Sequence, residues 1–290
     1  MKSAHKEILF DIVVYSLVFL AGAVTLYPFI YVFSMSISNP ISVVRNEVFL
    51  FPKGFSLQSY ALIFKKPEIF IGFYNSAWYT VVGTILNVIF TVMAAYPLAR
   101  RKFFARNFFT VIFVFTMFFG GGMIPHFLLV VKLGLYDTRW ALILPGLIST
   151  WLLIICRAFI QTVPEEIFES AKMDGCSEFK FIYKILTPLI KPVLAVLAIY
   201  YGVGHWNSWF GALLYITDSN KMPVQIYLRQ IVIQSSSQIT SNPDVSAQNA
   251  LSLLQIKYAV IFLVSAPIIC IYPFFQKYFV KGVLIGSLKG

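Results

Sequence analysis

One short stretch of this 290-residue chain combines ionisable groups with a spacing that could make specific contacts. The stretch ESAKMDGCSEFKFIYKILTP runs from Glu169 to Pro188 and alternates carboxylates with lysines. Upstream, Pro164 and two glutamates are typical of a helix start, and Gly175 can end that helix because glycine adopts left-handed backbone angles freely. A second helix can begin at Ser177, with an apolar face formed by Phe179, Ile182, Tyr183 and Leu186. The sequence therefore predicts two short amphipathic helices joined by a sharp turn.

The other residue types that support chemistry are too sparse to form a site. The cysteines and histidines are too few and too far apart for a disulfide framework or a tetrahedral metal site. They are Cys156, Cys176, Cys270, His5, His126 and His205. The chain also has no GxxxxGK[ST] phosphate loop, and it has neither paired acids within its apolar runs nor a recognisable nucleophile set. We therefore expect no catalytic residue, no metal and no cofactor bound by this chain.

The elements that must position the charged stretch are apolar. Hydrophobic residues make up 59% of the chain and charged residues 12%, which is more apolar surface than one soluble core of this size can bury. Six runs reach the roughly 20 residues that a helix needs to cross the bilayer, and the first is too long for a signal peptide. They are about 12–37, 72–98, 108–131, 139–160, 192–217 and 258–279. We predict an all-α, multi-pass membrane protein, with one transmembrane domain over residues 1–290 and proline kinks within the runs.

Basic residues determine the predicted orientation. With both termini in the cytoplasm, the inner segments and span ends hold fourteen of the 23 basic residues, as the positive-inside rule requires. The strongest contribution is the cluster Arg100, Arg101, Lys102 and Arg106. This orientation places residues 164–188 inside and a polar loop, 218–257, outside. The net charge of +11 then reflects membrane topology rather than nucleic-acid binding.

Physical chemistry alone leaves two roles open for the inner segment. Its helices could lie in the lipid interface, or they could insert into a groove on a cytoplasmic protein. The carboxylates Glu169 and Asp174 favour the protein, because an anionic leaflet would repel them and arginines would attract them. Phe168 and Ala171, with Ile167, would then fill the groove.

The spacing of this segment resembles a known loop. Glu169-Ser-Ala171, three residues, Gly175, nine residues, Ile185 and Pro188 resemble the EAA loop, EAA-x3-G-x9-I-x-L-P, of permease subunits in binding-protein-dependent ABC importers. Ser170 and Thr187 depart mildly from that pattern. The flanking stretches GGGMIPHFLLVVKLGLYDTRWALILPG, WNSWFGALLYI and KYFVKGVLIGSLKG resemble the carbohydrate-uptake branch, in particular permeases for complex oligosaccharides and polysaccharides, uronate-containing ones included.

This resemblance implies a MetI-like fold with a cytoplasmic coupling loop, in the bacterial cytoplasmic membrane. The implied partners are a second, homologous permease, two cytoplasmic ATPase subunits that bind ATP and magnesium, and an extracytoplasmic sugar-binding protein. Glu169 would pair with a basic residue of the ATPase, and Gly175 would make the turn. The expected ATPase-contact residues are Phe168, Glu169, Ala171, Asp174, Gly175 and Phe179, together with the tail from Gly286 to Gly290, which includes Lys289.

Two groups of residues are candidates on the substrate side. Trp206, Asn207 and Trp209 could line the pathway, because aromatic faces stack on sugar rings and an amide bonds hydroxyls, although tryptophans also anchor spans at interfaces. The resemblance to maltose-type permeases implies that the polar outer stretch docks the binding protein, unless it is disordered. The docking candidates are Ser235, Ser236, Gln238 and Asn242. The outer segments carry nine basic and five acidic residues, an excess that could suit an anionic saccharide.

Two other classes of function remain as alternatives. An ion-coupled secondary transporter would usually place ionisable groups inside its spans, and the six runs contain no Asp or Glu. A purely structural membrane subunit would leave the loop spacing unexplained. The sequence does not identify the saccharide, or whether the two permeases are identical.

Overall fold

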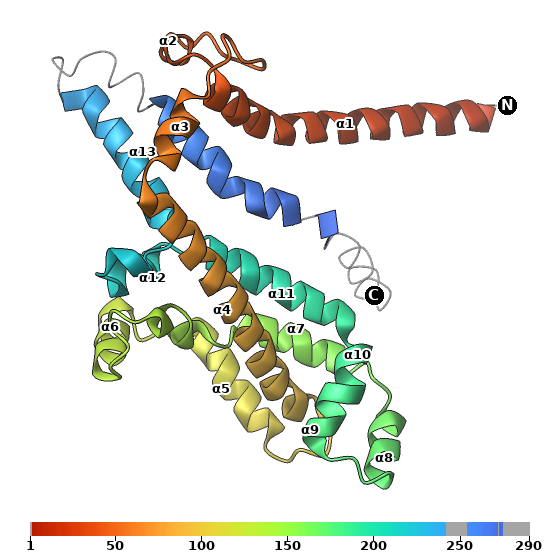
Figure 1. The fold of residues 1–290 in the computed structure, drawn as a ribbon. Coiled ribbons are helices and arrows are strands. Elements are labelled where there is room, and N and C mark those ends of the chain that lie inside the picture. The colour runs from red at the N-terminus through yellow and green to blue at the C-terminus, as the bar shows by residue number, and fades with distance from the viewer. Residues whose placement is uncertain (1, 242–253, 272, 275–290) are drawn as a thin grey trace. The chain divides into compact units, whose positions relative to one another are not determined.

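The computed structural model describes residues 2–241, 254–271 and 273–274, and its regular elements there are helices (Figure 1). Three helices are long and apolar enough to cross a membrane: Phe10–Ile37, Pro67–Ala99 and Leu254–Ile271. Three further pairs of helices pass the same test only when the two members are taken together, and each pair bends by more than 40° at a short break. Counting each bent pair as one span gives six within the described residues, which confirms the predicted all-helical, multi-pass fold.

One compact unit comprises residues 1–69 and 227–267. It contains α1 (Lys2–Ile37), α2 (Pro40–Val44), α3 (Gln58–Phe64) and most of α13 (Val224–Ser241). A small core cluster joins the end of α1 to the last long helix, with Met35, Val43, Val48, Tyr31, Leu254 and Tyr258. The apolar window of Phe10–Ile37 has no buried share at all, so this helix requires lipid or another protein around it.

The second compact unit, residues 70–226 and 268–290, carries the candidate site. Helices α4 (Pro67–Ala99), α7 (Thr150–Ile160) and α11 (Lys191–Trp206) share one core, in which Ala95, Leu153 and Leu197 are buried. The other α-helices are α5 (Arg106–Phe118), α6 (Met123–Lys132), α8 (Glu165–Met173), α9 (Glu178–Phe181), α10 (Thr187–Leu189) and α12 (Phe210–Tyr215). Short 3-10 helices at Arg139–Leu142, Leu144–Gly146 and Ser219–Lys221 and a π-helical turn at Ile182–Leu186 also belong to this unit.

The predicted span 108–131 is not one continuous helix. Helices α5 and α6 meet at 117°, and the break contains three consecutive glycines, 120–122. Gly122 has φ +84°, a backbone angle that residues with a Cβ rarely adopt. The 13 residues of α5 extend only about 20 Å, less than the roughly 30 Å of a hydrocarbon core. The run is apolar enough to cross a membrane, as predicted, but it does not form the single continuous helix that was expected.

The predicted spans 139–160 and 192–217 are also interrupted. The 3-10 segment Arg139–Gly146 meets α7 at 52°, and α11 ends at Trp206 instead of continuing to residue 217. Before α11, the helical segment Glu178–Leu189 joins it at 90°. Helices α1 and α4, by contrast, continue through Pro28 and Pro97, so a proline alone does not determine where these spans break.

The predicted outer loop 218–257 is helical in its first half. Helix α13 occupies Val224–Ser241, although this stretch is too polar to be recognised as a span. It follows Pro223 and contains neither glycine nor proline before Pro243, which is a helix pattern. This stretch was predicted to be a loop because its glutamines and serines have low hydropathy.

Candidate functional site

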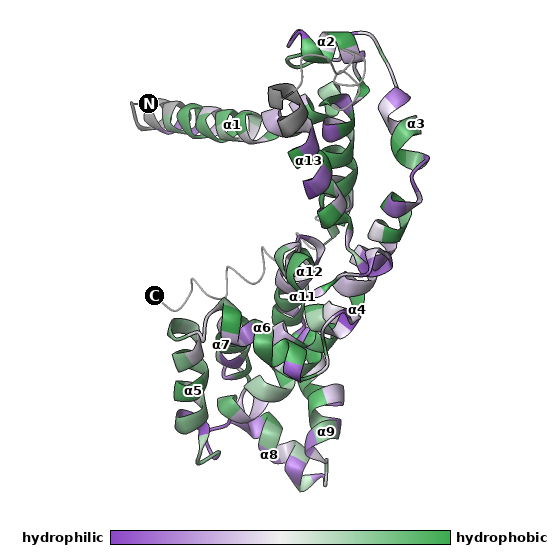
Figure 2. Ribbon diagram, turned by 90° about the vertical axis from the view of Figure 1, so that its left-hand side faces the viewer, coloured by the Kyte–Doolittle hydropathy of each residue, from purple (hydrophilic) through white to green (hydrophobic). Residues whose placement is uncertain are grey.

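The segment 164–188 forms the predicted helix–turn–helix arrangement. Helix α8 ends at Met173, and Gly175 has φ +68°, the left-handed conformation predicted for it. Figure 2 shows hydrophilic residues concentrated on α8, in contrast to the mostly hydrophobic α5. The predicted apolar face of the second helix is right for Leu186, which is buried, but wrong for Phe179 and Tyr183, which are exposed, and Phe181 is buried although it was not assigned to that face. The π-helical turn from Ile182 to Leu186 changes the residue spacing on which that face depended.

Helices α8 and α9 pack against the C-terminal end of α4, because Phe168 of α8 and Phe181 of α9 share one buried core with Tyr96. The Arg100 guanidinium lies 4.0 Å from the centroid of the Phe168 ring and 3.3 Å from the Glu165 carboxylate. From the same end of α4, the Tyr96 hydroxyl donates a hydrogen bond to the Glu178 carboxylate. We call Tyr96, Arg100, Glu165, Phe168 and Glu178 the α4 clamp. One helix end therefore contacts both short helices of the segment.

The predicted ATPase-contact residues divide into two groups in the structure. Phe168 and Ala171 are buried in the core of this chain, so they hold α8 in place and cannot fill a groove on another protein as predicted. Asp174 and Gly175 are exposed. Phe179 is 75% exposed, as is Tyr183, and Met173 is 88% exposed. We call these three large, exposed side chains of the segment the apolar tip, and only Phe179 of the three was among the predicted contact residues.

Glu169 has a partner within the chain. Lys102 Nζ lies 2.9 Å from its Oε1. The hydrogen bond and the positive charge of Lys102 lower the pKa of the Glu169 carboxyl. Both side chains are largely exposed, so the pair contributes little to stability but keeps the carboxylate ionised. The sequence pattern could not show this contact, which joins residues 67 positions apart.

The two departures from the EAA-like spacing are both accommodated locally. The Ser170 hydroxyl donates to the carbonyl of Glu166 at 2.7 Å, one turn back in α8. The Thr187 hydroxyl donates to the carbonyl of Ile182 at 2.7 Å, across the π-helical turn. Neither hydroxyl disturbs the turn at Gly175.

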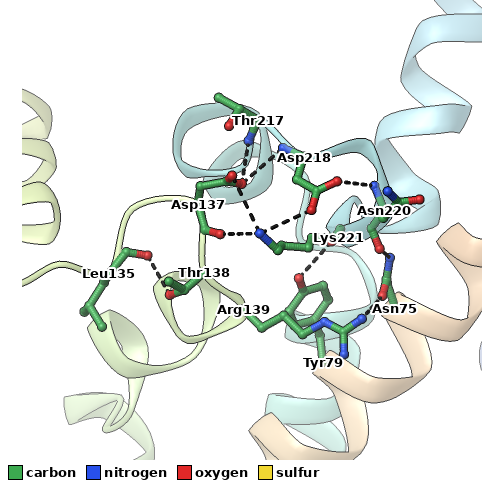
Figure 3. A network of polar contacts seen from close by, with 10 residues as sticks. All are labelled: Asn75, Tyr79, Leu135, Asp137, Thr138, Arg139, Thr217, Asp218, Asn220 and Lys221. Atoms are coloured by element: carbon green, nitrogen blue, oxygen red, sulfur yellow. Dashed lines mark hydrogen bonds and ion pairs between the residues drawn. The ribbon is translucent and has the colours of Figure 1, made fainter.

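A polar cluster lies near the N-terminal end of α4 (Figure 3). Asp137 Oδ1 accepts from the backbone amides of Thr217 and Asp218 at 3.0 and 3.1 Å. Lys221 Nζ lies 3.6 Å from Asp137 Oδ2 and 3.2 Å from Asp218 Oδ2. The amides of Asp218 and Thr217, followed by Lys221, lower the pKa of Asp137. These contacts connect the loop before the Arg139 3-10 helix with the segment after α12.

The same cluster is bonded to α4 itself. The Asn75 side-chain amide donates to the carbonyls of Asn220 and Met222 at 2.7 and 3.1 Å, and its oxygen accepts from Arg139 at 2.9 Å. The Tyr79 hydroxyl donates to the carbonyl of Lys221 at 2.8 Å. Both halves of α4 thus carry polar side chains that fix neighbouring segments, and these side chains were not among the predicted site residues.

Midway along α4, Asn87 binds the backbone of the interrupted span. Its Nδ2 donates to the carbonyls of Gly146 and Leu147, both at 2.8 Å. These carbonyls are released where the 3-10 segment meets α7, and buried carbonyls without partners would be costly within a membrane. His205 Nε2 lies 2.7 Å from Asn87 Oδ1, and a Cβ on Gly83 would come within 2.4 Å of that nitrogen. Glycine at position 83 therefore makes room for the imidazole.

The predicted substrate-pathway residues do not form one surface. Trp206 is buried and packs 6.1 Å from the Phe73 ring, whereas Asn207 is exposed at the end of α11. Trp209 is partly exposed and contacts Phe210 edge to face. A recess of about 390 Å³ lies instead between α7 and α11, lined by Trp151, Tyr200 and His205 among others. None of these three was selected from the sequence as a pathway residue.

The predicted docking and tail residues are largely beyond what the structure describes. Ser235 is buried in α13 and donates to the carbonyl of Val232 at 2.9 Å, so it is not the exposed loop residue that was predicted. The side chains of Ser236 and Gln238, and the whole of Asn242, Gly286 and Lys289, lie outside the described residues.

Comparisons with known proteins agree with this architecture. Residues 87–285 match the family described as "Binding-protein-dependent transport system inner membrane component". The chain is 46% identical over 270 residues to Protein LplC of Bacillus subtilis (strain 168), covering 93% of this chain and 91% of that protein. It is 40% identical over 285 residues to the polygalacturonan/rhamnogalacturonan transport system permease protein YtcP of the same organism, covering 98% of this chain and all of that one.

A solved structure agrees over nearly the full length. It is described as a bacterial ABC transporter involved in the import of the acidic polysaccharide alginate, with a TM-score of 0.85 and 31% sequence identity. The match covers 94% of this chain and 98% of that chain. On the family match, the two relatives and this fold, the chain belongs to the family of inner-membrane permease components of binding-protein-dependent transport systems.

Proposed function

We propose that this chain forms half of the translocation pathway of a bacterial, ATP-driven importer for uronate-containing oligosaccharides or polysaccharides. The observation that carries this proposal is the 40% identity, over 98% of this chain and all of the relative, to a permease named for polygalacturonan and rhamnogalacturonan. Both of those polymers contain uronic acids, and the structural relative is named for alginate, an acidic polysaccharide. Three large classes of acidic saccharide are therefore the first candidates.

The proposed assembly contains four further subunits or proteins in the bacterial cytoplasmic membrane or beside it. A second, homologous but different permease completes the pathway, and two ATPase subunits bind ATP and magnesium in the cytoplasm. A sugar-binding protein delivers the cargo from the other side. Both termini of this chain and the segment 164–188 face the cytoplasm, in agreement with the basic cluster from Arg100 to Arg106. Hydrolysis of ATP occurs in the partner subunits, and this chain has a transport role only.

The segment 164–188 is the proposed coupling element. Its exposed apolar tip, Met173, Phe179 and Tyr183, can insert into a hydrophobic socket on the ATPase, with Glu169 and Asp174 beside it for charged contacts. The α4 clamp would transmit movement of this tip directly to a transmembrane helix. Such a rigid connection supports an alternating-access cycle in which closure of the ATPase dimer tilts the attached spans.

Uptake of labelled saccharides by the source bacterium tests this proposal. A deletion strain should fail to import fluorescently labelled oligogalacturonides, rhamnogalacturonan fragments or alginate oligosaccharides, and expression of the chain should restore uptake of at least one. Labelled maltooligosaccharides serve as a neutral control that the complemented strain should not import through this system. Unchanged uptake of all three acidic classes in the deletion strain would contradict the proposed cargo. A purified complex without an ATPase subunit would contradict the proposed assembly.

A further inference from the structure

A recess between α7 and α11 has the lining of a carbohydrate site. Its volume is about 390 Å³, at the lower end of the roughly 300–1,000 Å³ of small-molecule sites. The chemistry is contributed by Ser149, Trp151, Tyr200, Gly204, His205 and Ser208. The lining contains no Asp, Glu, Lys or Arg, so the recess suits an uncharged polar surface better than a free ion.

The recess lies within the membrane rather than at its surface. Gly204 is 13 residues from the start of α11 at Lys191, or about 20 Å along the helix axis. The segment opposite is the break between the 3-10 helix Leu144–Gly146 and α7. Interrupted backbone at this depth is stable only where protein covers it or where it lines a water-filled cavity. Asn87 already bonds the carbonyls at this break, but the hydroxyls of Ser149 and Ser208 in the lining make lipid an unfavourable neighbour for this face.

Two large aromatic side chains are available in the recess. Trp151 is 60% exposed and Tyr200 is 53% exposed, although both belong to transmembrane segments. Aromatic faces attract the weakly positive C–H faces of pyranose rings through their quadrupole. The Ser149 and Ser208 hydroxyls in the same recess can exchange hydrogen bonds with sugar hydroxyls.

The hydrogen-bond network leaves His205 with an acceptor for the recess. Because Asn87 Nδ2 donates to two carbonyls, Asn87 Oδ1 is the acceptor in the contact with His205, and Nε2 must carry the hydrogen. In the neutral imidazole, Nδ1 then has a free lone pair. Among the described residues, no hydrogen bond reaches Nδ1. A sugar hydroxyl in the recess could donate to it.

Glycines keep the recess open. A Cβ placed on Gly146 or Gly204 would meet no atom within 4 Å, so neither glycine is required for packing inside this chain. Gly202, two residues before Gly204 on the same helix, instead faces Thr84 of α4. The open space beside Gly146 and Gly204 coincides with the lining of the recess.

We propose that this recess is a saccharide-binding site through which this subunit contacts the cargo directly. Trp151 and Tyr200 would stack on sugar rings, while Ser149, Ser208 and His205 Nδ1 would bond hydroxyls. The site recognises ring faces and hydroxyls and leaves carboxylates unpaired, so acidic and neutral residues of one polymer could pass through it. This inference depends on the proposed saccharide transport and assigns part of the recognition to this chain.

A photolabelling experiment tests contact in the assembled transporter. The probe is an oligogalacturonide with a diazirine at its reducing end, delivered by the binding protein to the complete complex during ATP hydrolysis. We expect cross-links in peptides that contain Trp151 or Tyr200, and about tenfold fewer in Trp151→Ala, in agreement with loss of a stacking contact of about 1.4 kcal/mol. Labelling confined to the second permease would overturn the proposal.

A second experiment fills the recess instead of removing a contact. Gly204→Phe places a ring in open space and should reduce uptake of oligogalacturonides by about tenfold or more. The matched control is Val203→Phe, which adds the same ring at an exposed neighbouring position outside the lining and should leave uptake unchanged. Equal uptake by both variants, at equal amounts of co-purified complex, would exclude the site.

The two hypotheses can fail separately. If the unmodified complex imports no saccharide, the proposed function is wrong. If it imports oligogalacturonides while Gly204→Phe behaves like Val203→Phe and no label reaches Trp151 or Tyr200, only the binding site is wrong. In that case the recess is covered by the second permease and serves helix packing.

Discussion

Lys102 Nζ lies 2.9 Å from the carboxylate of Glu169, so the acidic position of the EAA-like spacing is already paired inside its own subunit. The pair connects the loop after α4 with α8, and both side chains remain largely exposed. An ATPase residue could therefore share or replace Lys102 without first removing Glu169 from a buried site. Glu169 can therefore act through Lys102 or directly on the ATPase, and separate substitutions of the two residues distinguish these roles.

Glu169→Gln should weaken the attachment of the ATPase, whereas Lys102→Gln should not. Both variants remove the same internal ion pair, but only the first removes the negative charge offered to the partner. We expect about tenfold less ATPase to co-purify with Glu169→Gln, equivalent to about 1.4 kcal/mol. Thermal unfolding should be nearly unchanged in both, because an exposed pair contributes about 0–1 kcal/mol. If both variants lose the ATPase equally, Glu169 acts only through Lys102.

Gly175→Ala should destabilise the turn through the backbone alone. Its φ of +68° is unfavourable for a residue with a Cβ, while a Cβ there would meet no atom within 4 Å. We expect a loss of about 1–2 kcal/mol in the stability of the turn. Gly175→Asn is the matched variant, because asparagine tolerates left-handed angles better, and should retain more activity. Protection of the segment against proteolysis and coupled ATPase activity measure the difference. Equal behaviour of the two variants would show that φ is not the constraint.

Gly83→Ala should disturb the centre of the bundle. The added methyl group would lie 2.4 Å from His205 Nε2, so the imidazole or α4 must move. Overpacking of this kind costs about 1–3 kcal/mol and should lower the unfolding temperature of the purified complex by about 3–8 °C. The control is Gly202→Ala, whose Cβ would make only an ordinary 3.5 Å contact with Thr84 Oγ1. A Gly83→Ala complex as stable as that control would contradict the observed Asn87–His205 geometry.

The fold class could be predicted from the sequence because the hydropathy of each run depends only on the residues within it. Six apolar runs predicted six spans, and the EAA-like spacing predicted the turn at Gly175, where backbone conformation depends on a single residue. The family found by comparison also agrees with the resemblance and removes the basis for an ion-coupled transporter or a purely structural subunit. Hydropathy and a glycine turn are local properties, so they can be predicted without knowledge of tertiary contacts.

What could not be predicted depends on contacts between distant residues. Hydropathy does not distinguish a straight span from two helices at 117°, as in α5 and α6. The α4 clamp joins Arg100 to Phe168, and the recess joins Trp151 to Tyr200, so neither was visible in one sequence. Phe179 and Tyr183 do not share a buried face with Leu186 as predicted, because a π-helical turn changed the spacing.

The polar cluster around Asp137 should make stability depend on pH in the acid range. Backbone amides and the Lys221 ammonium lower the pKa of Asp137. The backbone amide of Asn220 and the side chain of Lys221 lower the pKa of Asp218. Because the folded-state pKa values are lowered, this stabilisation is complete above the ordinary carboxyl pKa of 3.8 and is lost as pH falls through the lowered values. The difference in unfolding temperature between the unmodified complex and Asp137→Asn should therefore be constant from neutral pH to about 5 and shrink below about 4. A difference that grows on acidification would contradict this sign. Glu166→Gln, at an exposed carboxylate outside the cluster, provides the control.

Arg100→Lys should uncouple ATP hydrolysis from transport while leaving the ATPase attached. The guanidinium of Arg100 lies over the Phe168 ring and beside Glu165, so it connects the end of α4 with α8. Lysine retains the positive charge, but its ammonium group cannot stack as a planar guanidinium does. The exposed tip and Glu169 remain available to the ATPase, whereas movement of α8 is transmitted to α4 less completely. We expect saccharide imported per ATP hydrolysed in proteoliposomes to fall about threefold or more, as for a loss of about 0.7 kcal/mol in a cation–π contact.

Arg101→Lys changes the adjacent residue, which is exposed and has no ring beneath it among the described contacts, and should preserve the ratio. An unchanged ratio in Arg100→Lys, at equal ATPase content, would show that the α4 clamp does not carry the coupling movement.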